Sequence, residues 1–327
     1  MNPNEIKNFL GEDWFKVQEK MKSILNSDID LLNKTNESIL SNSGKQVRPM
    51  LALLIARACS AGLANEDTHS FAAAAELLHN ATLLHDDVAD DSDQRRGKPT
   101  IKSLMGPCVS VLVGDYWLVW AMELIFSAGD KGNEVIRYFS RTLSDLAEGE
   151  MLQLQKAQTC DTDINDYIRI VFSKTASLFE VAALSAAASV NAPKEIAEAV
   201  RKYAVALGIA FQIRDDIFDY SEGMDVGKPL GVDILEQKIT MPLLAAMENV
   251  SEEKQAYIRG LVSKIVGKPE LREEIVAFVR ENNGVDCAQR KLEQYVQEAI
   301  DSISILPQTK EKDYLIELVT YVGTRQS

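Results

Sequence analysis

The chain has 327 residues, of which 46% are hydrophobic and 26% are charged, so it is long and apolar enough to bury a large core. Its net charge of −14 argues against nucleic acid as the main partner, because phosphate backbones attract basic proteins. No uninterrupted run of about 20 apolar residues occurs, so we expect no integral membrane span. The N-terminus is charged and amphipathic and lacks the apolar core of a secretory signal, which predicts a cytoplasmic protein.

The cysteines are scattered along the chain without the spacing of metal ligands. They are Cys59, Cys108, Cys160 and Cys287. We expect reduced and mostly buried thiols, as is typical of a cytosolic protein.

Helical periodicity accounts for nearly every segment, and the alternation typical of strands is absent. In chain order, we expect helices over residues 47–62, 69–91, 110–128, 137–157, 166–190, 194–223, 252–266, 269–304 with a break near Gly284, and 310–325. Gly62, Gly129 and Pro193 are suitable helix ends. Because no repeat or linker divides the chain, the pattern predicts one all-α domain over residues 1–327.

Two acidic clusters share the spacing Asp-Asp-x-x-Asp, and each falls at the C-terminal end of a long apolar helix. They are Asp86, Asp87 and Asp90, and Asp215, Asp216 and Asp219. Residues i and i+4 share a helix face, and this end of the helix dipole is unfavourable for carboxylates. The repeated pattern therefore indicates divalent cations, and oxygen ligands suit Mg²⁺ or Mn²⁺ bound together with substrate phosphates. A solvated helix end explains one such cluster better than two.

Basic and polar side chains gather around the clusters. Lys45 and Arg48 precede Pro49, which suits the first position of a helix, so two cations and free N–H groups would form an anion site. Arg95 and Arg96 follow the first cluster and can bind phosphate oxygens with two hydrogen bonds each. Further donors are Lys174, Thr175, Gln212, Lys228 and Lys238. Each alone is typical of a solvated surface, but together they predict a ligand that carries at least one diphosphate.

These motifs occur in one order over nearly the whole chain. They are GKQVRP (44–49), LLHDDVADDSDQRRGKPT (83–100), VLVGDYW (111–117), GEMLQL (149–154), KTASLF (174–179), FQIRDDIFDY (211–220) and GKPLGVDILEQKITMPLL (227–244). In this combination the chain resembles the trans-isoprenyl diphosphate synthases, also called polyprenyl synthetases. The resemblance implies an isoprenoid synthase-type helical bundle around a deep central cavity, usually as a homodimer.

The resemblance also implies the metal ligands. In this family the two Asp-rich motifs face each other across the cavity mouth and share three Mg²⁺, for which Mn²⁺ can substitute. By resemblance, Asp86, Asp90 and Asp215 are expected to be direct metal ligands, and Asp87, Asp216 and Asp219 to be supporting or occasional ligands.

The substrates implied are isopentenyl diphosphate and an allylic diphosphate such as farnesyl diphosphate. The first matches Lys45, Arg48, His79 and Arg96; the second matches Arg95, Lys174, Thr175, Gln212, Lys228 and Lys238. The reaction is a head-to-tail condensation that releases pyrophosphate, and the expected catalytic residues are Asp86, Asp87, Asp90, Lys174 and Asp215. The proton passes to the pyrophosphate, so no histidine base is needed. We expect His69 on the surface and His85 packed beside Asp86.

Product length in this family depends on the residues before the first motif. The residues concerned are Phe71, Ala75, Leu78, Ala81 and Thr82. Ala81 and Thr82 replace the aromatic residues of many short-chain enzymes, and Phe71 lies 11 residues before Thr82. A wall of small residues about 16 Å long favours a product of about C30 to C50, with octaprenyl-like lengths central.

Four alternatives remain open at this point. A short-chain farnesyl or geranylgeranyl diphosphate synthase would carry aromatic residues before Asp86. A class I terpene cyclase would carry a different second metal motif. A regulatory subunit would have lost part of one cluster. A catalytic subunit that needs a small partner subunit would keep both clusters, as this chain does.

Overall fold

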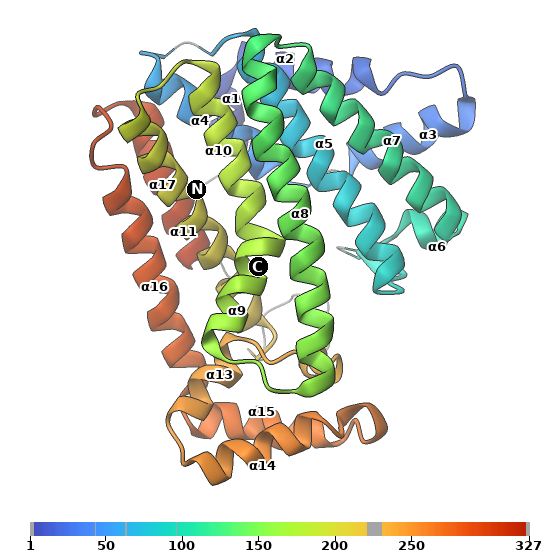
Figure 1. Ribbon diagram of the computed structural model, residues 1–327, viewed down its shortest axis with the longest axis vertical. Helices are drawn as coiled ribbons and strands as arrows, with labels where there is room; N and C mark the ends of the chain where they lie inside the picture. The colour runs from blue at the N-terminus through green and yellow to red at the C-terminus, as the bar shows by residue number, and fades with distance from the viewer. Residues whose placement is uncertain (1–2, 43, 63, 96, 221–230, 325–327) are drawn as a thin grey trace. The chain divides into compact units, whose positions relative to one another are not determined.

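The computed structural model describes residues 3–42, 44–62, 64–95, 97–220 and 231–324, and most of them are helical, which confirms the all-α class (Figure 1). The chain divides into two compact units: unit 1 comprises Met1–Arg141, Leu178–Arg201 and Ile303–Glu317, and unit 2 comprises Thr142–Ser177, Lys202–Ser302 and Leu318–Ser327. That the whole chain forms one domain stays a prediction.

Unit 1 holds the helices of the N-terminal part and one short hairpin. These are α1 (Pro3–Leu10), α2 (Glu12–Ile24), α3 (Asp30–Ser41), α4 (Val47–Cys59), α5 (Glu66–Ala89), β1 (Gln94–Arg95), β2 (Lys98–Pro99), α6 (Ile101–Met105) and α7 (Pro107–Phe126). Four helices contribute residues to both units: α8 (Asp130–Thr159), α10 (Ser177–Ser189), α11 (Lys194–Phe218) and α17 (Lys310–Thr324).

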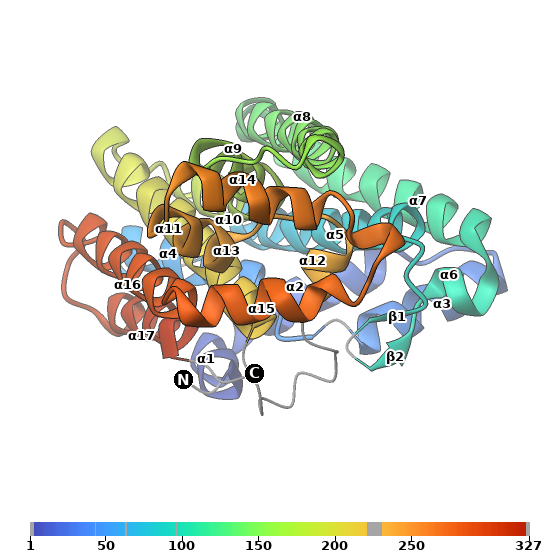
Figure 2. The ribbon, with the colours of Figure 1, turned by 90° about the horizontal axis from the view of Figure 1, so that it is seen from below.

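The other elements of unit 2 lie wholly within it. They are α9 (Ile164–Val171), the π-helical turn η1 (Phe172–Ala176), α12 (Val232–Leu235), α13 (Met241–Glu248), α14 (Glu252–Val262), the 3₁₀ turn η2 (Ile265–Gly267), α15 (Leu271–Glu281) and α16 (Gly284–Ser302). Figure 2 shows α14 and α15 lying side by side. The predicted helix break near Gly284 is confirmed, because α15 ends at Glu281 and α16 begins at Gly284.

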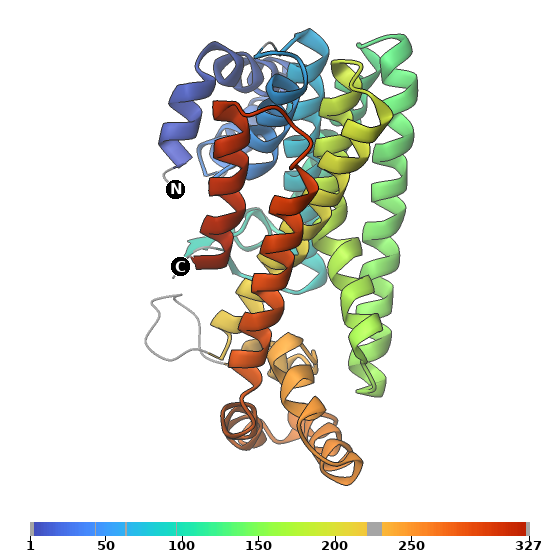
Figure 3. The ribbon, with the colours of Figure 1, turned by 90° about the vertical axis from the view of Figure 1, so that its left-hand side faces the viewer.

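The core of unit 1 forms around α5, which packs along α7 and also contacts α2, α4 and α6. The alanine run at residues 72–75 is fully buried, so its small side chains let neighbouring helices approach closely. Gly114 of α7 shows how close this is: a Cβ atom there would lie 2.4 Å from His85 Nε2. Figure 3 shows α1 (blue) beside the first turns of α17 (dark red), and the rings of Phe9 on α1 and Tyr314 at the start of α17 are 4.8 Å apart.

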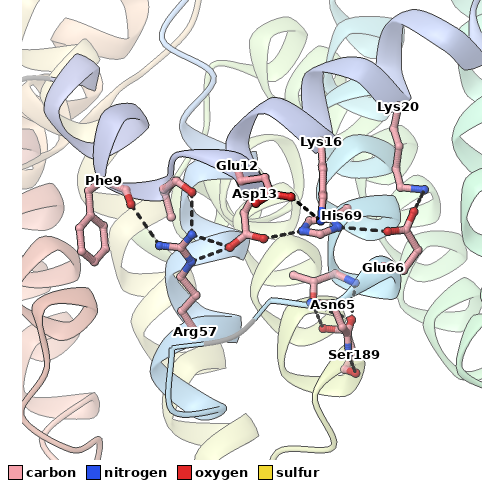
Figure 4. A network of polar contacts seen from close by, with 12 residues as sticks. Phe9, Glu12, Asp13, Lys16, Lys20, Arg57, Asn65, Glu66, His69 and Ser189 are labelled. Carbon is pink, nitrogen blue, oxygen red and sulfur yellow. Dashed lines mark hydrogen bonds and ion pairs between the residues drawn. The ribbon is translucent and has the colours of Figure 1, made fainter.

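A buried polar network joins the N-terminal helices to α4 and α5 (Figure 4). Arg57 donates to Asp13 Oδ2 from Nε at 2.7 Å and to the carbonyls of Phe9 and Leu10 at 3.2 and 2.6 Å. The other oxygen of Asp13 lies 2.8 Å from His69 Nε2. Arg57 and His69 hold the pKa of Asp13 below its usual range, although burial acts in the opposite direction as the largest single influence.

The same region fixes the start of α5. Asn65 Oδ1 accepts from the backbone N–H of Thr68 at 2.9 Å and forms a capping box with it. Asn65 also donates to the carbonyl of Ser189 at 2.8 Å, which ties the end of α10 to the start of α5 (Figure 4). The prediction that His69 lies on the surface was wrong: its side chain is 2% exposed, and its ring nitrogens lie 2.8 Å from the largely buried Asp13 and 3.4 Å from the exposed Glu66.

Several local expectations differ from the structure. α4 begins at Val47, so Pro49 occupies the third helical position and not the first. The helix expected over residues 166–190 contains the π-helical turn η1. No strands were expected, but β1 and β2, of two residues each, form a short antiparallel hairpin. The cysteines are free, but only Cys160 is buried, while Cys108 is exposed.

Two helical stretches, Pro107–Phe126 and Ile164–Ser189, are long and apolar enough to cross a membrane by length and composition alone. In the structure 39% and 67% of the most apolar 18-residue window of each stretch is buried, so the second stretch is mostly covered by the protein. The expected absence of an integral span stays a prediction.

Replacing Asp13 by alanine tests the buried network. The change leaves the Arg57 guanidinium, whose side chain is 13% exposed, without its carboxylate. We expect the free energy of unfolding, measured by urea titration, to fall by about 3 kcal/mol. Lys16→Ala on the same helix removes only the surface pair with Glu12, so the free energy of unfolding should stay close to that of the wild type. Equal losses in the two variants would contradict a structural role for the network.

Candidate functional site

The first acidic cluster ends α5, as the sequence predicts. Asp86 is half-buried in the last turn, Asp87 is buried, and Asp90 is the exposed C-cap residue. Because the helix dipole is negative at this end, the three carboxylates are stable only with compensating charges or donors.

Asp87 receives such a partner from the hairpin that follows the helix. Arg95 Nε donates to Asp87 Oδ1 at 2.8 Å. Burial raises the pKa of Asp87, while the Arg95 guanidinium acts in the opposite direction. Arg95 therefore neutralises a carboxylate in this structure, and the predicted Arg96 lies outside the described residues.

Lys102 compensates the next two carboxylates, which sequence reasoning left unassigned. Its Nζ lies 2.5 Å from Asp91 and 3.0 Å from Asp93, and its hydrogen bond lowers the pKa of Asp91. These two acids are thereby paired with a protein cation. A basic residue nine positions after Asp93 was the sequence signal that we did not use.

The residues matched to isopentenyl diphosphate lie in unit 1 on α4, on α5 and in the turn before α4. Lys45 is exposed, and Arg48 is half-buried, with its guanidinium carbon 4.7 Å from the ring centroid of Phe179. His79 is half-buried on α5, two turns before Asp86. Gln46 between Lys45 and α4 has a left-handed backbone (φ 53°), which turns the chain sharply into the helix.

The second acidic cluster ends α11 in unit 2, and its middle member is buried. Tyr167 of α9 donates to Asp216 Oδ2 at 2.6 Å, and Gln212 donates to Asp216 Oδ1 at 2.9 Å. The backbone N–H of Met241 adds a third donor at 3.3 Å. Burial, reinforced by the nearby carboxylate of Asp233, raises the pKa of Asp216 to about 7, and the three donors act in the opposite direction.

The other two members of this cluster have different surroundings. Asp215 is half-buried on α11. Asp219 lies just after the helix, where its carboxylate accepts from the N–H groups of Val232 and Asp233 at 3.0 and 3.2 Å. Asp219 therefore binds the start of α12, a role that the spacing of the motif does not reveal.

The π-helical turn η1 places Lys174 and Thr175. Lys174 Nζ lies 2.5 Å from Glu150 and 3.1 Å from Gln153 on α8, both in the GEMLQL segment, and Thr175 donates to Gln212 Oε1 on α11 at 2.9 Å. Wider turns of this kind are frequent at functional sites. The structure thus brings Thr175 and Gln212 together, as the prediction of a shared ligand requires.

Two glycines allow the neighbouring helices to contact this turn. A Cβ atom at Gly149 of α8 would lie 2.5 Å from Ser173 Cβ, and one at Gly208 of α11 would lie 2.5 Å from Ala176 Cα. Neither position can accept a larger residue without moving the turn. The turn is therefore held between α8 and α11 by direct backbone contact.

The remaining predicted residues are found as follows. Lys238 pairs with Glu236 after α12, and Lys228 lies outside the described residues. The proposed chain-length residues share α5: Phe71, Ala75, Leu78 and Ala81 are buried, and Thr82 is half-buried.

A complete metal centre is not assembled by the residues that the structure describes, since no three His, Cys, Asp or Glu side chains meet there. The donor chemistry nevertheless fits a hard cation. Asp86, Asp90 and Asp215 offer only carboxylate oxygens and are at least partly exposed, so substrate phosphates and water can complete the ligand set.

Comparison with known proteins relates these features to a family. A sequence model of the polyprenyl synthetase family matches residues 29–279. The chain is 36% identical to the octaprenyl diphosphate synthase of Haemophilus influenzae over 319 residues, which covers 97% of this chain and 95% of that protein. It is 34% identical to the all-trans-nonaprenyl-diphosphate synthase (geranyl-diphosphate specific) of Rhodobacter capsulatus, covering 94% of each.

Solved structures give the same result for the fold. The crystal structure of a decaprenyl diphosphate synthase from Rhodobacter capsulatus superposes with a TM-score of 0.90 at 32% identity and 98% coverage of both chains. A polyprenyl synthase from Caulobacter crescentus, crystallised with calcium and isoprenyl diphosphate, gives a TM-score of 0.88 at 29% identity, covering 100% of this chain and 98% of that one. With two acidic clusters at the ends of α5 and α11 and matches along nearly its full length, the chain belongs to the polyprenyl synthetase family.

Proposed function

We propose that this protein is a Mg²⁺-dependent prenyltransferase that condenses isopentenyl diphosphate with an allylic diphosphate to make an all-trans polyprenyl diphosphate of medium to long chain. The observation that carries the proposal is the pair of Asp-Asp-x-x-Asp clusters, each at a helix end and each with basic or amide side chains beside it. The names of the octaprenyl and nonaprenyl diphosphate synthases to which the chain is similar support the product class.

The residues take the following roles in this proposal. Asp86, Asp90 and Asp215 hold the metal, and Asp87, Asp216 and Asp219 keep the surrounding backbone in place. When bound, Mg²⁺ supplies the positive charge that neutralises the diphosphate. Lys174 and Lys238 stabilise the charge that builds on the departing pyrophosphate, with Thr175, Gln212 and Arg95 orienting it. Lys45, Arg48 and His79 hold isopentenyl diphosphate, whose double bond attacks the allylic carbon.

The surroundings of Lys174 support this role. In the structure its ammonium group is paired with Glu150 and held by Gln153, which fixes a flexible side chain at a defined place. A diphosphate carries more negative charge than one carboxylate, so it can compete for the same ammonium group. Binding would thus use a cation that is already positioned, which lowers the entropy cost of the contact.

We also propose a homodimer, which the outer face of α7 supports. Leu112, Val119 and Phe126 recur every seven residues and are 63%, 62% and 51% exposed. A seven-residue repeat of apolar side chains is typical of a seam between two helices. A second copy of this chain, which presents the same face, would cover the stripe on both subunits.

The protein would act in the cytoplasm, where both substrates are water-soluble diphosphates.

The first test is a product assay. Purified protein is incubated with Mg²⁺, farnesyl diphosphate and labelled isopentenyl diphosphate, and the products are sized after dephosphorylation. We expect a ladder that extends well past geranylgeranyl length, that disappears with a chelator and that returns with Mg²⁺. Asp86→Ala and Asp215→Ala should each lower turnover by about a thousandfold, because each removes a metal ligand.

Asp93→Ala is the matched control for these variants. Asp93 is an exposed acid of the same segment, but it pairs with Lys102, so its loss should change turnover by less than about twofold. Full activity of Asp86→Ala would overturn the assignment of the metal ligands, and a wild-type protein that incorporates no label would overturn the proposed function.

Ala81→Phe tests the control of product length. Ala81 is buried on α5 five residues before Asp86, so a phenyl ring there would occupy the space that a growing chain needs. We expect shorter products at a similar rate of first condensation, with the product distribution measured by chromatography. Ala81→Ser, which adds almost no volume, should leave that distribution unchanged. If Ala81→Phe makes wild-type products, the length is set elsewhere.

Leu112→Glu combined with Val119→Glu tests the dimer. The change places two charges on the exposed stripe of α7, where a second copy would have to bury them. We expect the mass from light scattering to fall from dimer to monomer. Leu31→Glu, on an equally exposed leucine of α3, should leave the mass unchanged. A wild-type monomer, or a dimer that persists in the double variant, would exclude this interface.

A further inference from the structure

Four polar side chains of unit 2 form one continuous chain of hydrogen bonds. It runs from Thr175 on η1 to Gln212 on α11 (2.9 Å), on to Asp216 one turn later (2.9 Å), and ends at the hydroxyl of Tyr167 on α9 (2.6 Å). Its two ends belong to different helical segments, and of its two middle members Asp216 is buried and Gln212 is half-buried. Tyr167 is thus connected to Thr175 through two side chains of α11.

The donors and acceptors of this chain are fixed by chemistry. In the structure the Tyr167 hydroxyl and the Gln212 amide nitrogen both donate to Asp216, as they must wherever its carboxylate is ionised and can only accept. The amide nitrogen of Gln212 is then committed to Asp216, which leaves its oxygen to accept from Thr175. Reversing the amide would place its oxygen against the carboxylate oxygen of Asp216, where two acceptors would meet. The carboxylate therefore sets the orientation of Gln212, and through it the position of the Thr175 hydroxyl.

Two members of the chain adjoin residues assigned to substrate or metal binding. Thr175 follows Lys174 on η1, and Asp216 follows Asp215 on α11. Tyr167 itself is fully buried, so it cannot touch a diphosphate. Any effect of its hydroxyl on substrate must pass through Asp216.

We propose that Tyr167 is a positioning residue for the diphosphate- and metal-binding part of the site, acting through Asp216 and Gln212. The proposal rests on the proposed function, because it assigns Tyr167 to one part of that site. Its hydroxyl holds one oxygen of Asp216 while Gln212 holds the other, so the carboxylate cannot rotate toward the metal. Asp216 then serves as an anchor between α9 and α11, and Asp215 is presented as the ligand.

Tyr167→Phe removes only the hydroxyl and keeps the ring in its buried place. The backbone N–H of Met241 still donates to the same oxygen at 3.3 Å, so Asp216 keeps a donor on each oxygen and the protein should fold. The matched control is Tyr203→Phe, which removes an equally buried hydroxyl of unit 2. Tyr203 lies 13 residues before Asp216 on α11, about 20 Å away along the helix axis.

The first readout is binding of inorganic pyrophosphate with Mg²⁺, measured by calorimetry, which does not depend on turnover. We expect the Kd to rise about tenfold in Tyr167→Phe, as for the loss of a hydrogen bond to a charged group, and to stay within about twofold in Tyr203→Phe. An unchanged Kd in Tyr167→Phe overturns the proposal. So does an equal rise in the two variants, which would indicate a general effect of lost buried hydroxyls.

The second readout separates the two substrates in the product assay. Tyr167→Phe should raise the KM for the allylic diphosphate and the Mg²⁺ concentration at half-maximal rate by about tenfold, while the KM for isopentenyl diphosphate stays within about twofold. Equal changes in both KM values would contradict a positioning role. A wild-type protein that binds pyrophosphate but makes no product would refute the proposed function alone, because the calorimetric comparison would still stand.

Discussion

A carboxylate at the C-terminal end of a helix requires a compensating charge or a hydrogen-bond donor, and both acidic clusters are organised around that requirement. In each cluster the second aspartate is buried and receives its partners from the protein. Arg95 donates a hydrogen bond to Asp87, while Tyr167 and other donors bind Asp216. The first aspartate of each cluster keeps partial exposure. In both clusters one acid thus fixes the local structure, while under the proposed function its neighbour binds the cation.

α5 shows how this arrangement depends on the rest of unit 1. The helix is capped at its start by Asn65, which is in turn bound to Ser189, and its end is held by the contact of Arg95 with Asp87. Between these points the side chains are almost all buried against α4 and α7. A helix fixed at both ends and packed along its length cannot slide, so residues spaced along it keep constant distances from the acidic end. A fixed helix of this kind is suited to the role in product length that is proposed for α5.

Much of the fold could be predicted because helical periodicity and the spacing of two aspartates are local features of a sequence. Contacts between residues that are distant in the sequence could not be predicted in this way. The contact of Tyr167 with Asp216 joins residues 49 positions apart, and His69 was wrongly expected on the surface because its partner Asp13 lies 56 positions upstream. The π-helical turn was also missed, since its apolar spacing reads as an ordinary helix. The sequence therefore does not show how the helices pack against one another, and the residues that support the acidic clusters depend on that packing.

The π-helical turn at Phe172–Ala176 also constrains how this segment can evolve. Each residue of an α-helix advances the chain by about 100°, so deleting a single residue here would rotate Lys174 or Thr175 away from α8 and α11. Gly149 and Gly208 press on the turn from two sides and leave no room for a compensating bulge. Substitutions that keep the length of the segment disturb one contact at a time, whereas an insertion or deletion disturbs all of them together. The number of residues in this turn is therefore more tightly constrained than the identity of any single residue in it.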